Sequence, residues 1–397
     1  MLWFARRAAV SSSRMAQPLR VAVIGAGWAA ELHLQAYAAN EATEPVAICS
    51  RTRSTAEDVA ARFGVQGVYT DFDELLRAEE LDVVSIATPP DAHREFTLGA
   101  ADAGCHVLCD KPVALTAQET EELLNGVESR GVRHATGFIW RNDPALRRLR
   151  SLIGDGSIGE IRELHCRCAI GAPVLPMTWM YDAAAGGGSL MQHGQHIIDR
   201  ARWLLASEIV GVSGELTYDV KETVQGPKFH NVFDAFGWAA KRAREGGGDD
   251  LPTVEVTADT GYSFMASFEN GVRAQFWEAM HSSGLSPDQI EVFGSEGTLV
   301  WSATSGLVKL QGRRPPEQIE VEGTSASGAG DLRGAEEAGH RYWCELVRAF
   351  ADDIRGAEHD DYPTIYDGWK VQQVVDAVRA STESRSWEEI PSRARVS

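Results

Sequence analysis

The chain has 397 residues, of which 44% are apolar and 24% charged, and its formal net charge is −19. This length exceeds what one hydrophobic core usually serves, so we expect a globular protein of two domains. The excess of Asp and Glu disfavours nucleic acids and anionic membranes as partners, because a phosphate-binding surface needs clustered Lys and Arg. No stretch reaches the roughly 18 consecutive apolar residues of a membrane helix.

Residues 1–18 differ in composition from the rest of the chain. They carry Arg6, Arg7 and Arg14 and several serines but no acid, which is typical of a transit segment. Alternatively, residues 1–14 are an upstream extension and Met15 is the true start. The six cysteines have neither a paired metal-ligand spacing nor the density of a secreted disulfide scaffold. We therefore expect buried thiols in a cytoplasmic protein, or a mitochondrial one if residues 1–14 are a targeting signal.

Residues 19–141 alternate short apolar runs with helical ones, which is the βαβ rhythm of a parallel sheet. The strand-like runs are RVAVIGAG, VAICSR, VVSIATPP, HVLCDKPVAL and RHATGFIW. Capping boxes are expected for Ser54 with Glu57 and for Thr116 with Glu119, and Gly64 is expected to end a helix. The sequence predicts a doubly wound α/β domain.

Residues 142–391 contain longer strand-like runs joined by turns, such as Asn270-Gly271 and Glu296-Gly297. This pattern predicts an α+β domain with a mainly antiparallel sheet, followed by helices over residues 338–355 and 367–382. Residues 244–250 and 323–331 are rich in Gly, Ser and Asp and are expected to be surface loops, and residues 392–397 a tail.

A glycine loop follows the first predicted strand and opens a helix. Gly25 and Gly27 would let the backbone approach a pyrophosphate, and the helix that starts near Trp28 and Ala29 would stabilise its charge. We therefore expect a dinucleotide cofactor bound by a Rossmann domain over residues 19–141.

The end of the second strand favours NADP over NAD. An NAD-preferring site places Asp or Glu there for the ribose hydroxyls, but this chain has Ser50 and Arg51. A hydroxyl donor and a planar guanidinium suit a 2′-phosphate. NADP is the preferred prediction, and NAD stays open.

Four further motifs accompany the glycine loop: Thr88-Pro89-Pro90 with His93, Cys109-Asp110-Lys111-Pro112, Gly137-Phe138 running to Arg141, and Gly186-Gly187-Gly188 running to His196. Together they make the chain resemble the glucose-fructose oxidoreductase, inositol dehydrogenase and rhizopine-catabolism (Gfo/Idh/MocA) family from about residue 19 to 390. The resemblance implies a Rossmann domain followed by a substrate-binding and oligomerisation domain with a large open-faced sheet.

The resemblance also implies roles for individual residues. Lys111 would hydrogen-bond the reacting oxygen beside the nicotinamide, and His196 would accept the substrate's proton. Both residue types suit hydride transfer from a hydroxyl carbon, because loss of the hydroxyl proton accompanies it. Thr88, Pro89, His93 and Asp110 are further expected cofactor contacts, along with Lys111.

One position departs from the family pattern. Four residues before His196, where the family usually has an acid, this chain has Gln192, which cannot exchange a proton but can hydrogen-bond a substrate hydroxyl. We count Gln192 with Lys111 and His196 as catalytic candidates, and Arg141 and Asp182 with Gln192 and His196 as substrate-contact candidates.

The leading interpretation is an NAD(P)-dependent oxidoreductase of sugars, cyclitols or related polyols. Two alternatives stay open: a nucleotide-binding sensor of the same fold without turnover, and an enzyme resembling trans-dihydrodiol or xylose dehydrogenases. We expect no metal site and a homo-oligomer, either a dimer or a tetramer, built sheet to sheet.

Overall fold

A computed structural model describes residues 17–246, 251–282, 286–322 and 332–391. They form two compact units: the first contains residues up to Ile139 and Glu337–Trp369, and the second contains Trp140–Glu336 and the residues from Lys370 onward. These units differ from the expected domains in two respects: the boundary falls after residue 139 and not after residue 141, and residues 337–369 belong with the first unit and not with the second. The possible targeting segment, the 323–331 loop and the 392–397 tail lie outside the described residues.

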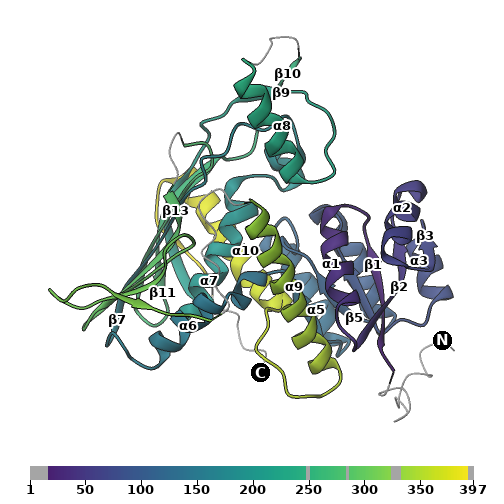
Figure 1. The fold of residues 1–397 in the computed structure, drawn as a ribbon, viewed down its shortest axis with the longest axis horizontal. Coiled ribbons are helices and arrows are strands. Elements are labelled where there is room, and N and C mark those ends of the chain that lie inside the picture. Colours follow the sequence, from purple (N-terminus) through teal and green to yellow (C-terminus); the bar gives the residue numbers. More distant parts are fainter. Residues whose placement is uncertain (1–16, 247–250, 283–285, 323–331, 392–397) are drawn as a thin grey trace. The chain divides into compact units, whose positions relative to one another are not determined.

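The first unit is built on a parallel sheet with strand order β3-β2-β1-β4-β5-β6, which is the Rossmann order (Figure 1). Its strands are β1 (Leu19–Ile24), β2 (Thr43–Cys49), β3 (Gly67–Tyr69), β4 (Val83–Ile86), β5 (His106–Cys109) and β6 (His134–Thr136). Its helices are α1 (Trp28–Ala38), α2 (Arg53–Phe63), α3 (Phe72–Ala78), the 3₁₀ turn η1 (Pro90–Ala92), α4 (His93–Asp102), α5 (Ala117–Ser129) and most of α9 (Leu332–Ile354). The predicted α/β fold is confirmed.

The helix caps of the first unit agree with the sequence at two of three places. Thr116 and Glu119 form a reciprocal capping box at α5, and Gly64 ends α2 in the left-handed conformation. The box expected at Ser54 is wrong: α2 begins at Arg53 after Thr52, so Ser54 already lies within the first helical turn.

The core of the first unit includes residues from both of its chain segments. Buried side chains of β1, β4 and β5 pack with Ile365 and Trp369 in one apolar cluster. Gly368 lies in close contact with this core, since a Cβ at Gly368 would come within 2.5 Å of Val113. The C-terminal segment therefore completes a core that the N-terminal strands begin.

The second unit is built on a nine-stranded sheet among the described residues, in the order β16-β15-β14-β13-β7-β12-β11-β8-β17. Its strands are β7 (Ile161–Ala169), β8 (Ile209–Thr217), β11 (Gly261–Phe268), β12 (Arg273–Ala279), β13 (Ser286–Gly294), β14 (Thr298–Ser302), β15 (Gly306–Leu310), β16 (Glu317–Ile319) and β17 (Glu388–Glu389). The hairpins at Asn270-Gly271 and Glu296-Gly297 are present. The sheet is mainly antiparallel, as predicted, but its central pair β7 and β12 is parallel.

The helices of the second unit are η2 (Ile139–Asn142), α6 (Pro144–Gly154), η3 (Trp179–Tyr181), η4 (Ala183–Ala185), the π-helical turn η5 (Leu190–Gly194), α7 (Gln195–Leu205), α8 (Val232–Arg244) and α10 (Ile365–Ser384), whose first turn belongs to the first unit. Among them, α6, α7 and α10 lie on one face of the sheet, and α8 lies apart from it (Figure 1). On β11 and β12, buried residues alternate with exposed ones, so among the described residues nothing covers the opposite face of these strands.

A small excursion of β9 (Glu222–Val224), α8 and β10 (Thr253–Glu255) extends from the second unit (Figure 1). It has an apolar cluster of its own, formed by Leu175, Tyr181, Ala235, Ala239 and Val256. This excursion was not predicted from the sequence, because the Gly- and Asp-rich residues 244–250 interrupt its pattern.

Candidate active site

The glycine loop joins β1 to α1 and fits a dinucleotide phosphate. Gly25 has φ +117°, and a Cβ at this residue would lie 2.5 Å from the carbonyl oxygen of Ala87. Gly27 differs, because a Cβ there would meet nothing within 4 Å. The N-terminus of α1 at Trp28 and Ala29 has no side-chain cap, so its first N–H groups can bind an anion.

The residues after β2 are accessible. The backbone N–H of Ser50 donates to Tyr69, which fixes the strand end, and Arg51 is exposed. Arg51 pairs with no carboxylate in the part of the chain that the structure describes, whereas Arg53 lies 3.7 Å from Glu57.

The segment after β4 is held by His93. This buried ring has Nε2 2.8 Å from the Thr88 carbonyl oxygen and Nδ1 3.2 Å from that of Val113. Burial lowers the pKa of His93. The contacts of His93 thus shape the Thr88-Pro89 turn, and direct cofactor contacts by these three residues stay predictions.

Asp110 and Lys111 follow β5 directly. The Asp110 carboxylate accepts a 2.7 Å bond from the Lys111 N–H and lies 3.8 Å from Nε2 of His33. Gly137 borders this carboxylate so closely that a Cβ would lie 2.3 Å from it. Burial lowers the pKa of Lys111, although Asp110 opposes the shift. A lowered pKa makes the Lys111 ammonium a readier proton donor than an ordinary lysine.

In the second unit, three consecutive glycines form a tight turn before η5. A Cβ at Gly187 would lie 2.5 Å from the Met180 carbonyl oxygen, and a Cβ at Gly188 would lie 2.1 Å from the Asp259 carboxylate. Asp259 in turn accepts from the Leu190 N–H. The glycine motif is therefore a packing requirement that sets the start of η5.

Gln192 and Asp182 both bind backbone groups of this turn. The Gln192 amide donates to the Gly186 carbonyl at 2.9 Å, and the Asp182 carboxylate caps η4 by accepting from Ala184. Their substrate contacts stay predictions. His196 lies on the first turn of α7 and is partly exposed.

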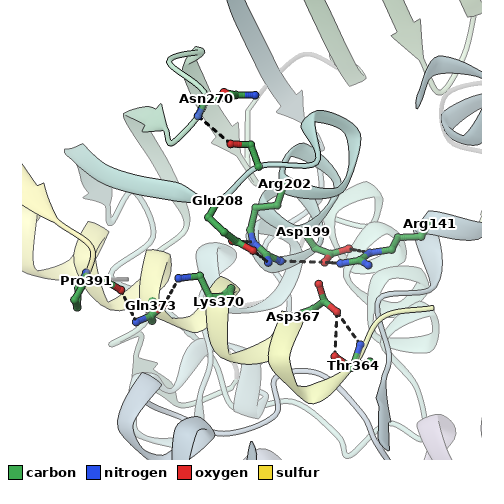
Figure 2. Close-up of polar contacts among 11 residues, drawn as sticks. Arg141, Asp199, Arg202, Glu208, Asn270, Thr364, Asp367, Lys370, Gln373 and Pro391 are labelled. Carbon is green, nitrogen blue, oxygen red and sulfur yellow. Dashed lines mark hydrogen bonds and ion pairs between the residues drawn. The ribbon is translucent and has the colours of Figure 1, made fainter. Parts of the chain in front are cut away.

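Arg141 binds Asp199 in a buried ion pair (Figure 2). Its Nε lies 2.9 Å from Oδ2, and its Nη2 binds the other carboxylate oxygen. The Asp199 carboxylate also lies 3.7 Å from Arg202, which makes two bonds to Glu208. Arg141 thus anchors η2 to α7, and its contact with substrate stays a prediction.

A further carboxylate of this region, Glu278 on β12, was not predicted from the sequence. It is buried, and it binds His193 of η5, Ser189 and Tyr262. The available signal was weak: a lone acidic residue at a buried position of an otherwise alternating strand.

Within the described residues, no group of three or more His, Cys, Asp or Glu side chains could hold a metal ion. In the same ranges, no helix has the length and apolar character needed to cross a membrane.

Two family models match the chain. One, described as an oxidoreductase family with an NAD-binding Rossmann fold, matches residues 19–138, and the other, the GFO/IDH/MocA C-terminal domain, matches residues 146–300.

Individual proteins are similar over most of the chain. Levoglucosan dehydrogenase of Pseudarthrobacter phenanthrenivorans is 28% identical, with 94% of this chain and 99% of the relative covered. D-glucoside 3-dehydrogenase of Escherichia coli is 32% identical over 56% of this chain and 70% of the relative. Among solved structures, an oxidoreductase domain protein from Kribbella flavida matches with a TM-score of 0.78 and 26% identity, covering 95% of this chain and 100% of its own.

Proposed function

Because this chain belongs to the Gfo/Idh/MocA oxidoreductase family, we propose that it transfers a hydride between NADP(H) and a hydroxyl or carbonyl carbon of a sugar, cyclitol or related polyol. The expected resemblance is thereby confirmed. The observation that carries the proposal is Lys111, a half-buried lysine of lowered pKa that lies beside Asp110 where β5 ends. Open α/β sheets bind their ligands at the carboxyl ends of the strands.

In this proposal, each group of residues has a separate role. The glycine loop and the N-terminus of α1 hold the pyrophosphate, and the bound nicotinamide supplies the hydride acceptor or donor. Lys111 stabilises negative charge on the reacting oxygen. Lys111 and His196 share the acid-base and orienting roles.

The names of the relatives support the substrate class. They act on levoglucosan, D-glucosides and D-xylose, which are all polyhydroxylated rings or chains. Such substrates require several fixed donors and acceptors, and Gln192 and Asp182 are our candidates for two of these contacts.

The preference for NADP rests on Arg51. Its guanidinium is exposed, follows β2 and pairs with no described carboxylate, so it can bind a 2′-phosphate without first breaking an ion pair. An acid at this position, which would favour NAD, is lacking.

The test is nucleotide-dependent turnover at 340 nm with a panel of sugars, cyclitols and diols, using wild type and Lys111→Ala. We expect turnover of at least one sugar or cyclitol by the wild type and a loss of about 10²-fold or more in kcat for the variant. Tight nucleotide binding without any turnover would instead favour the sensor of the same fold.

We also propose that the chain forms a homo-oligomer through the uncovered face of its large sheet. Met265 of β11 and Trp277 of β12 are 56% and 41% exposed on this face. Large apolar side chains on an open sheet favour association. Light scattering that gives a monomer at micromolar concentration would refute this proposal.

A further inference from the structure

His33 of α1 is a fully buried histidine that the proposed function does not use. Its ring nitrogen Nδ1 lies 2.8 Å from the hydroxyl of Ser85, which is fully buried on β4. Polar groups in a hydrophobic core cost free energy, and an apolar pair of the same shape would fill this space without that cost. Packing alone therefore does not explain why His33 and Ser85 occupy the core.

The other nitrogen of the His33 ring faces Asp110. Nε2 lies 3.8 Å from Oδ2 of the Asp110 carboxylate and makes no hydrogen bond to any described residue. This distance is longer than a hydrogen bond, so the N–H group acts on the carboxylate electrostatically across a short gap. Because an ionised carboxylate accepts hydrogen bonds and donates none, we assign the proton of the neutral ring to Nε2, with Nδ1 accepting from the Ser85 hydroxyl.

Two neighbours enclose the His33 ring and the Asp110 carboxylate. The indole of Trp343 on α9 packs against the imidazole, with the ring centroids 4.3 Å apart. Gly137, which follows β6, leaves room for the carboxylate, because a Cβ there would strike Oδ1 of Asp110 and lie 3.1 Å from the Trp343 ring. Residues of α1, α9 and the ends of β5 and β6 thus surround one imidazole and one carboxylate, all within the first unit.

The Asp110 carboxylate connects His33 to Lys111. Its Oδ1 accepts a 2.7 Å hydrogen bond from the backbone N–H of Lys111, while Oδ2 faces His33. Burial would raise the pKa of Asp110, but His33 opposes this effect most strongly, Lys111 adds to the opposition, and the pKa is lowered. Burial lowers the pKa of Lys111, and the charge of Asp110 limits that fall. The charge on Asp110 therefore depends on His33, and the charge on Lys111 depends on Asp110.

Two other titratable groups near Asp110 stay neutral. Burial lowers the pKa of His93 on α4, and burial raises the pKa of the Cys109 thiol on β5. An imidazole of lowered pKa and a thiol of raised pKa carry no charge at neutral pH. His33 and Lys111 therefore remain as the groups that stabilise the ionised Asp110 carboxylate.

We propose that His33 is a positioning residue of the hydride-transfer site: through the Asp110 carboxylate, it fixes Lys111 at the end of β5 and keeps its ammonium group charged. Ser85 sets the direction of the His33 ring. His33 itself contacts neither nucleotide nor substrate, because it is fully buried. Its role in catalysis rests on the proposed function, whereas its effect on Lys111 does not.

The first experiment needs neither nucleotide nor turnover. Acetic anhydride acetylates the free amine of a lysine and not its ammonium, so the acetylation rate of Lys111 between pH 7 and 10 reports how readily it loses its proton. Mass spectrometry separates Lys111 from the other five lysines of the chain, which serve as internal references. We expect Asp110→Asn and His33→Phe each to raise the Lys111 rate about threefold or more near pH 7, because the ammonium loses the support of a nearby negative charge.

His134→Phe is the matched control. His134 belongs to the same unit, and its Nδ1 accepts a 3.2 Å hydrogen bond from the Ile365 N–H, but it starts β6 and so lies at the opposite edge of the sheet from Lys111. We expect the wild-type Lys111 rate in this variant. A wild-type rate in His33→Phe or in Asp110→Asn overturns the inference. If His33→Phe does not fold, Ser85→Ala replaces it, because it removes only the hydroxyl that orients the ring.

The second experiment uses the substrate that the wild type turns over. We expect His33→Phe to lower kcat about tenfold or more at nearly constant KM, because His33 acts through Lys111 and contacts no substrate. In an Asp110→Asn background, the same substitution should have little further effect. Losses that multiply in the double variant would indicate a merely structural role and overturn the inference. Circular dichroism checks that each variant folds.

The two experiments separate this inference from the proposed function. If the wild type turns over no substrate, the proposed function fails, and the acetylation rates still decide whether His33 acts on Lys111. If Lys111→Ala abolishes turnover while His33→Phe keeps wild-type kcat and acetylation, the inference fails and the proposed function stands.

Discussion

The side-chain amide of Gln192 donates to the carbonyl oxygen of Gly186 at 2.9 Å, and this bond ties the π-helical turn to the glycine turn before it. The bond needs an N–H group, which an ionised aspartate lacks. Restoring the family's acid at this position therefore has a structural cost in this chain, whatever it does for proton transfer.

We predict that Gln192→Asp lowers the free energy of unfolding by about 1–3 kcal/mol, because a buried carbonyl loses its donor and faces a carboxylate. Urea unfolding measures the change. Gln66→Asp is the control: the Gln66 amide donates to the Gly64 carbonyl at 3.0 Å in an exposed setting, where water can replace it. Equal stability losses in both variants would contradict the prediction.

The two glycines of the nucleotide loop should respond differently to alanine. Gly25→Ala should fold poorly, because Gly25 has positive φ and its Cβ would strike the Ala87 carbonyl. Gly27→Ala should keep the wild-type melting temperature but weaken nucleotide binding, because its Cβ would clash with no protein atom but would lie in the loop that we propose binds the pyrophosphate. Calorimetry and nucleotide titration separate the two effects. Unimpaired binding by Gly27→Ala would place the pyrophosphate elsewhere.

Asp199→Asn should destabilise the protein strongly. The substitution leaves the buried guanidinium of Arg141 without its counter-charge, and losing one partner of a buried pair costs about 3–5 kcal/mol. Glu163→Gln breaks an exposed pair with Arg273 and should cost less than about 1 kcal/mol. Chemical denaturation of both variants tests the contrast, and a small loss for Asp199→Asn would argue against a buried ion pair.

Asp259 should make the stability of the protein depend on pH. Burial raises the pKa of Asp259 from 3.8 to about 6, although the Leu190 N–H opposes the shift. The folded state therefore holds this proton more tightly than the unfolded chain. The contribution is full below pH 3.8 and is lost as the pH rises through about 6. In Asp259→Asn, the loss of unfolding free energy between these pH values should be smaller than in wild type, whereas Asp219→Asn, at an exposed position, should behave as wild type.

Arg51→Ala should reduce the ratio of NADP to NAD affinity by about tenfold or more, since a charge-assisted contact with the 2′-phosphate contributes about 1.5–3 kcal/mol. Fluorescence titration with both nucleotides measures the ratio. Arg53→Ala removes a neighbouring cation that already pairs with Glu57 and should change the ratio less. A wild type that prefers NAD would refute the assignment of Arg51.

The sequence predicted those parts of the fold that depend on residues close together in the chain. The Thr116 capping box, the Gly64 helix end and the Asn270-Gly271 hairpin each depend on a few neighbouring residues. The parallel pairing of β7 with β12 is different. These strands are more than 100 residues apart in the sequence, and no turn residue between them indicates that they pair. The three-residue strand β3 and the excursion with α8 are too short or too interrupted for a periodic pattern.

The candidate residues of the site differ in how far the sequence could indicate them. The glycines, Lys111 and His196 belong to contiguous motifs and could be named as candidates one by one, and their roles stay predictions. Glu278 could not, because its meaning comes from His193, 85 residues earlier in the chain, and from their contact in the folded unit. The ion pair of Arg141 with Asp199 is a similar case. Each residue belongs to a recognisable motif, but the sequence did not predict that their side chains bind each other.

The first unit is discontinuous, and this has a consequence for biosynthesis. Ile365 and Trp369 belong to its core, yet a ribosome makes them only after nearly the whole second unit has emerged. Until then, the nascent nucleotide-binding sheet exposes apolar surface around Val113 that Gly368 and its neighbours later cover. Expressing residues 17–139 alone should therefore give an aggregation-prone fragment. Premature termination before residue 365 should likewise prevent the first unit from completing its core, although most of that unit is synthesised first.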